Sequence, residues 1–97
     1  MKLGDFATVK TAMPRADFWL VRKGAQHTVG KPTREYNAEH IGILVTRTGA
    51  LDPKFLYYLL EHLHGRGYWI PKSHGTLKLV SIRATDVKEI AFEGRTP

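Results

Sequence analysis

The sequence predicts an α+β fold in which a small, curved and mainly antiparallel sheet carries one principal helix at about residues 53–64. Two short runs, 18–21 and 41–45, are rich in aromatic and β-branched residues, as expected of buried strands. Asp52 and Pro53 supply an N-cap and a first-turn proline, and apolar residues then recur at helical spacing. Short strands around a single long helix are the simplest arrangement that buries both.

The helix is expected to end at Gly65 or Gly67, where glycine can stop it. Its apolar stripe is predicted to pack in the core, and the stripe consists of Phe55, Leu56, Leu59, Leu60 and Leu63. His62 and His64 near its end are interpreted as side chains that interact favourably with the helix C-terminus.

The remaining elements have weaker signals. We expect strands at 3–9, 76–82 and 90–92, a long loop or loosely paired hairpin at 24–37, and a short helical turn at 86–89 capped by Thr85.

The composition bounds the fold and the setting. A length of 97 residues with 42% hydrophobic content suits one domain, 1–97, with an ordered core at about 2–92. Cysteine is absent, so folding rests on packing and a reducing compartment is expected. No apolar run approaches a membrane span and no signal peptide is recognised, so we expect a cytoplasmic protein without membrane contact.

The positive charge is concentrated in two segments. Lys and Arg number 15 against 9 acidic residues, which gives a net charge of +6 and favours polyanionic partners. Residues 18–34 hold four cations and no acid, and residues 62–85 repeat that pattern. We define these as the two acid-free segments. They are either a nucleic-acid surface or two solvated loops.

In the nucleic-acid interpretation, basic loops 22–34 and 66–83 make the contacts. Cations would contact phosphates and the other polar side chains would contact grooves or sugars. The candidate binding residues are Arg22, Lys23, Gln26, His27, Thr28, Lys31, Arg34, Lys72, Ser73, His74, Lys78 and Arg83. Gly24, Gly30 and Gly75 either let the backbone approach DNA or are simply turn residues.

Four aromatic residues have more than one possible role. They could contact a partner protein or lie in the core, and Trp69 could also stack on an unpaired base. The four are Tyr57, Tyr58, Tyr68 and Trp69.

No catalytic motif, metal motif or cofactor motif is present, so the chain is not expected to be an enzyme and no cofactor is predicted. The enzymatic alternative is a small toxin-like ribonuclease that uses histidine as the acid-base group. Its candidates are His27 or His74 together with Arg22, Lys72 or Arg83.

Several phrases, taken in order, resemble the target-recognition domain of type I restriction-modification specificity subunits. They are Leu3-Gly4-Asp5-Phe6-Ala7, the strand and basic-glycine turn at 16–24, Thr28-Val29-Gly30, the helix phrase at 51–60, and Gly75-Thr76 followed by 85–92. The resemblance covers roughly residues 2–92 and implies a DNA-binding function, with duplex favoured over single strand.

The chain departs from that family in ways that bear on its partners. Family subunits carry two such domains joined by long helices, and the region between Gly30 and the helix is shorter here, which puts sequence-specific reading in doubt. A single module also implies a homodimer or a protein partner. The further alternative is a protein-interaction module, for example a mobile-element or phage factor that interferes with a restriction or other DNA-processing complex.

Overall fold

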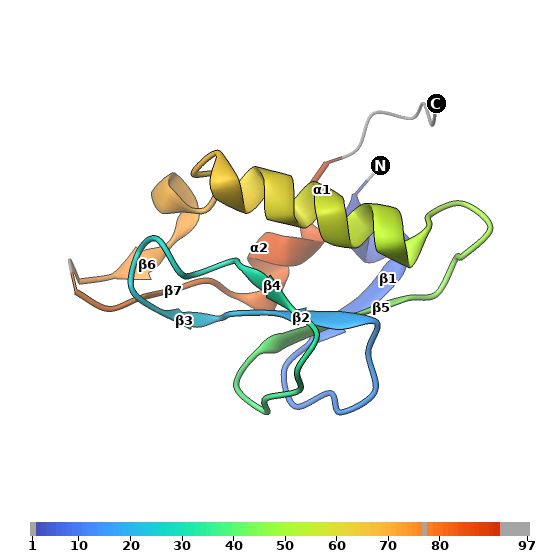
Figure 1. Cartoon of the computed structure of the whole chain (residues 1–97), viewed down its shortest axis with the longest axis horizontal. Helices are drawn as coiled ribbons and strands as arrows, with labels where there is room; N and C mark the ends of the chain where they lie inside the picture. The colour runs from blue at the N-terminus through green and yellow to red at the C-terminus, as the bar shows by residue number, and fades with distance from the viewer. Residues whose placement is uncertain (1, 77, 92–97) are drawn as a thin grey trace.

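A computed structural model describes residues 2–76 and 78–91, and it confirms the α+β class. Its strands form two antiparallel sheets, and helix α1 (Pro53–Gly65) passes over them (Figure 1). The single sheet expected from sequence is thus divided in two, because residues 23–24 pair with residues 80–81 and not with the strands of the first sheet.

The four-stranded sheet has the order β1-β5-β2-β4. Its central strand is β5 (Ile41–Val45), as predicted, with β1 (Ala7–Lys10) on one side and β2 (Phe18–Leu20) on the other. Ile43 pairs with both Val9 and Phe18, and all three are buried. The outer strand β4 (Pro32–Thr33) pairs with β2.

The three-stranded sheet has the order β3-β7-β6. Each strand is two residues long: β3 is Lys23–Gly24, β6 is His74–Gly75 and β7 is Val80–Ser81. The predicted strand at 76–82 is therefore wrong in extent, since only its last part pairs and residue 77 lies outside the described residues.

Helix α1 begins as the sequence predicts. The Asp52 carboxylate accepts a hydrogen bond from the Lys54 backbone N–H at 2.9 Å, and Pro53 stands in the first turn. Leu56 and Leu60 are fully buried, whereas Phe55 is 53% exposed. Placing Phe55 in the core was wrong, because Leu56 and Leu60, one turn apart, already occupy the inward face of the helix.

The chain ends pack together. The expected strand at 3–9 is instead a 3₁₀ turn, η1 (Leu3–Asp5), followed by β1. The expected turn at 86–89 is helix α2 (Ala84–Lys88), which places Thr85 inside the helix and not at its cap. Of the expected strand 90–92, Ala91 forms a bridge with Lys2 and residue 92 lies outside the described residues.

One exposed ion pair reinforces this closure. The Lys2 ammonium contacts the Glu89 carboxylate, and this hydrogen bond and charge hold the pKa of Lys2 above its usual value. The Leu3 backbone N–H also donates to the Ile90 carbonyl at 2.9 Å. Both ends of the described chain therefore lie on one side, away from β3, β6 and β7 (Figure 1).

Candidate nucleic-acid interface

The two acid-free segments meet in the three-stranded sheet. The first segment supplies β3, and the second supplies β6 and β7. Lys23 pairs with Ser81, and Ser81 pairs with His74 on its other side. Residues directly opposite each other in antiparallel strands share a face, so these three side chains form one row across the sheet. We call it the Lys23–Ser81–His74 row.

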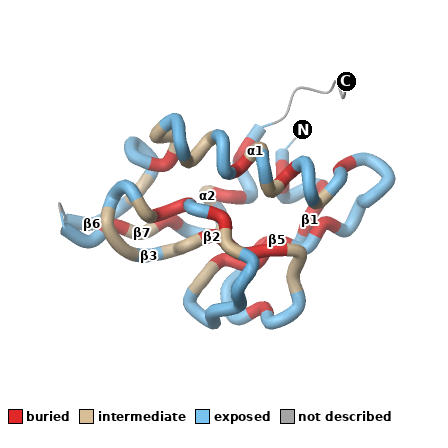
Figure 2. Tube along the Cα trace, in the orientation of Figure 1, coloured by how far each residue is buried: buried red, intermediate tan, exposed pale blue. Residues whose placement is uncertain are grey.

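The row faces away from the core. Val80, the neighbour of Ser81 in β7, is buried, and successive side chains of a strand point to opposite faces. Lys23 and His74 are exposed, and Figure 2 shows the chain at β6, at this end of the molecule, coloured mostly as exposed. The charge of the row is therefore available to solvent.

Glycine closes the hairpin that carries the row. Gly75 has φ +136, and a Cβ there would lie 2.3 Å from the Leu79 carbonyl oxygen. Thr76 N–H donates to that same carbonyl at 3.0 Å, and Leu79 N–H donates to the Thr76 hydroxyl at 3.2 Å. Packing within the turn is thus sufficient to explain why glycine stands at 75.

Four lysines of the predicted set keep their charge unpaired. Within residues 2–76 and 78–91, no acidic side chain forms an ion pair with any of them, and all are exposed. Lys72 lies over the Tyr68 ring, its Nζ 4.4 Å from the centroid, and burial raises the pKa of that tyrosine. The four are Lys23, Lys31, Lys72 and Lys78.

Asp86 partly neutralises one corner of this surface. It comes from α2, and its carboxylate lies 3.6 Å from both Arg83 Nε and His74 Nε2. The Arg83 guanidinium also lies 3.1 Å from His74 Nε2. Arg83 therefore already has partners, and His74 is the member of the row nearest to an acid.

Two predicted arginines are directed elsewhere. Arg22 donates from Nε to the Glu39 carbonyl at 2.7 Å. Arg34 lies 4.1 Å from the centroid of the Tyr57 ring and borders a pocket with Asp17 and residues 52–54, at the start of α1. Because the three-stranded sheet lies toward the other end of α1, the structure does not bring Arg34 to the row (Figure 1).

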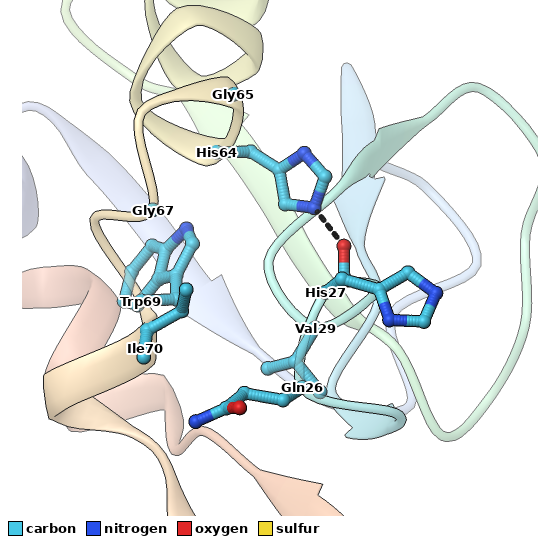
Figure 3. A pocket seen from close by; sticks show the side chains of 8 residues that line it. All are labelled: Gln26, His27, Val29, His64, Gly65, Gly67, Trp69 and Ile70. Atoms are coloured by element: carbon cyan, nitrogen blue, oxygen red, sulfur yellow. Dashed lines mark hydrogen bonds between the residues drawn. The ribbon is translucent and has the colours of Figure 1, made fainter.

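The other predicted polar residues divide into two groups. Ser73 uses its hydroxyl within the chain, donating to the Ile70 carbonyl at 3.0 Å, and Thr28 is half-buried. Gln26 and His27 are exposed and border a pocket between the loop after β3 and the end of α1 (Figure 3). In Figure 3 the Gln26 side chain extends toward Ile70, whereas the His27 ring points away from Trp69 and its carbonyl faces His64.

The pocket has a volume of about 250 Å³. The ring of His64 holds one wall in place: its Nε2 lies 2.7 Å from the His27 carbonyl, which can only accept, so Nε2 carries the proton. The sequence did not predict that these residues line one pocket, since only the fold joins the two segments. The lining residues are Gln26, His27, Val29, His64, Gly65, Gly67, Trp69 and Ile70.

Trp69 is a core residue. The prediction that its ring face could stack on an unpaired base is therefore wrong. It is 1% exposed and packs against Gly30, whose φ is +87. A Cβ on Gly30 would lie 1.9 Å from Trp69 Cδ1, so this glycine is required by close packing. Of the other aromatics, Tyr58 is 60% exposed, whereas Tyr57 and Tyr68 are partly buried against the core.

No helix within the described residues has both the length and the apolar character needed to cross a bilayer. Comparison of the chain with protein-family models, with curated proteins and with solved structures finds no match. The resemblance to a target-recognition domain therefore remains a prediction.

Proposed function

We propose that this chain is a nucleic-acid-binding protein that contacts DNA phosphates with the Lys23–Ser81–His74 row and the lysines around it. The observation that carries the proposal is the pairing of the two acid-free segments in one sheet, which puts Lys23 and His74 on the same exposed face. Lys23 and His74, 51 residues apart in sequence, thus contribute to one surface.

The chemistry of the surface favours phosphate over acidic metabolites. Lys23 and Lys72 present ammonium groups, Ser81 presents a hydroxyl, and Lys78 lies in the turn between β6 and β7. Such a mixture of cations and neutral donors is what proteins use against a sugar-phosphate backbone. We infer duplex DNA as the partner and the cytoplasm as the setting, with two copies or a protein partner enlarging the small footprint.

Salt dependence tests the proposal. Four unpaired lysines allow three or four phosphate contacts, so log affinity for a short labelled duplex should fall against log salt with a slope of roughly −3 to −4. Fluorescence anisotropy between about 50 and 200 mM salt measures the slope. A slope near zero with measurable binding, or no binding at the lower salt, would contradict the proposal.

A second candidate, an RNA-cleaving enzyme, is favoured by one observation. His74, Arg83 and Asp86 form a cluster in which an imidazole lies 3.1 Å from a guanidinium, a pairing suited to proton transfer beside a phosphate. Incubation with RNA, with and without chelator, separates the two functions. Cleavage that His74→Ala abolishes would support the enzyme, and intact RNA is expected if the chain only binds.

A further inference from the structure

The pocket between the loop after β3 and the end of α1 combines an apolar interior with polar groups at its base and rim. Both acid-free segments line it: Gln26, His27 and Val29 come from the first, and His64 to Ile70 come from the second. Among the described residues, no acidic or strongly basic side chain lines it. The interior therefore suits a neutral, partly polar group better than a phosphate.

A buried donor without an acceptor lies in the pocket wall. Trp69 is 1% exposed, and within the described residues its indole nitrogen has no hydrogen-bond partner. The other tryptophan, Trp19, donates from the equivalent nitrogen to the Met13 carbonyl at 2.8 Å. Buried N–H groups are normally paired, so the unpaired Trp69 nitrogen is a candidate donor to a ligand.

Figure 3 shows the Trp69 indole nitrogen on the edge of the ring that faces the space beneath His64 and Gly67. Gly30 packs against the same ring, so the indole is held by the loop from the opposite segment. The nitrogen itself is covered, and a Cβ on Gly30 would lie 2.3 Å from it, so a ligand acceptor reaches this donor only if the surrounding loop shifts.

The walls and the rim match a flat heterocycle. Val29 is buried and Ile70 is 47% exposed, so one aliphatic side chain lies inside and another lies at the opening. The Gln26 side chain extends along the rim toward Ile70 in Figure 3 and carries an amide that both donates and accepts. A nucleobase has this character, with apolar faces and an edge of ring nitrogens and carbonyls.

The volume limits what enters. About 250 Å³ is smaller than the pockets of roughly 300–1,000 Å³ that bind drug-sized ligands. One base fits such a space, and a stretch of oligonucleotide does not. Lys23 and Lys72, which we call the lysine surface together with the rest of the Lys23–Ser81–His74 row, adjoin the pocket in the chain. Lys72 follows Ile70 by two residues, and Lys23 begins the strand that leads into the loop of Gln26.

We propose that this pocket accepts one unpaired base of the nucleic-acid strand whose phosphates contact the Lys23–Ser81–His74 row. The inference rests on the proposed function, and it adds the class of nucleic acid preferred: DNA with a base outside the stack. An intact duplex offers no such base unless one is extruded, which costs energy. A duplex with a single bulged nucleotide should therefore bind better than the fully paired one.

Gly65 offers a way to block the pocket without removing a contact. It borders the pocket, a Cβ there meets no atom within 4 Å, and its backbone is outside the left-handed region. Gly65→Leu therefore adds a large side chain at the border of the pocket, and we expect it to hinder entry. Gly49→Leu is the matched control, because Gly49 has the same free space and lies in the loop before α1, away from the pocket.

Affinities of wild type, Gly65→Leu and Gly49→Leu for paired and bulged duplexes of one sequence test the inference. We expect wild type and Gly49→Leu to prefer the bulged duplex by roughly tenfold, and Gly65→Leu to bind both equally. Absence of a preference in wild type, or its survival in Gly65→Leu, would overturn the inference. A preserved salt slope in those cases would leave the phosphate surface standing, so the two proposals fail separately.

A second readout follows the buried donor directly. The two tryptophans give two indole N–H signals in a nitrogen-15 correlation spectrum, and Trp19, bonded to Met13, serves as the internal reference. Addition of each deoxynucleoside monophosphate in turn should shift the Trp69 signal and leave the Trp19 signal in place. Unchanged Trp69 signals with all four mononucleotides at millimolar concentration would contradict base entry.

Discussion

Gly30→Ala is expected to destabilise the fold by about 3–5 kcal/mol, enough to unfold much of a small domain. Two costs add at this position. The backbone at φ +87 is strained for any residue with a Cβ, and the new methyl group would lie 1.9 Å from the buried Trp69 ring. Neither the ring nor the loop can retreat freely, because Trp69 is 1% exposed and Gly30 N–H donates to the Val21 carbonyl at 2.8 Å.

Two other glycines separate these costs. Gly24→Ala carries backbone strain at φ +153 but meets no atom within 4 Å, and Gly49→Ala carries neither cost. Urea unfolding of the three variants should therefore rank Gly49→Ala as most stable, Gly24→Ala next and Gly30→Ala last. A Gly30→Ala variant as stable as Gly24→Ala would show that Trp69 is not packed against the loop as described.

Reversing two charges of the lysine surface should cost about a hundredfold in DNA affinity near 0.1 M salt. Lys23→Glu with Lys72→Glu removes two phosphate contacts, each worth on the order of tenfold under these conditions, and reduces the salt slope by about 2. Both lysines are exposed, and neither is paired with an acid among the described residues, so folding should be little affected.

The control for this variant is Lys10→Glu with Lys54→Glu. Both doubles change the net charge from +6 to +2, since each substitution subtracts two charges. Lys10 ends β1 in the other sheet, and Lys54 lies in the first turn of α1, far along the helix from the row. Equal loss of affinity in the two doubles would mean that total charge, and not this surface, governs binding.

Local signals in the sequence predicted the elements that depend on neighbouring residues. Asp52 and Pro53 fixed the start of α1, and the β-branched run at 41–45 predicted the central strand. The division into two sheets could not be predicted in this way, because it depends on pairing Lys23 with Ser81, 58 residues apart. The same long-range pairing forms the Lys23–Ser81–His74 row, which no local sequence pattern predicts.

The candidate site was predicted by charge but not by geometry. The distribution of charged residues in the sequence indicated where cations are concentrated. It could not indicate that Asp86 of α2 pairs with Arg83, or that Arg34 packs over the Tyr57 ring. Trp69 was assigned several possible roles because burial is not visible in sequence. A glycine at 30 with positive φ, packed on the indole, decides in favour of the core.

The central claim, that the row contacts nucleic acid, is tested most directly by mapping backbone amide shifts while a short paired DNA duplex is added. We expect the largest shifts at Lys23–Gly24, His74–Gly75 and Val80–Ser81, where the two acid-free segments pair. We expect small shifts in the first turns of α1 and in β1. Largest shifts at the start of α1, or shifts spread evenly over the molecule, would contradict it.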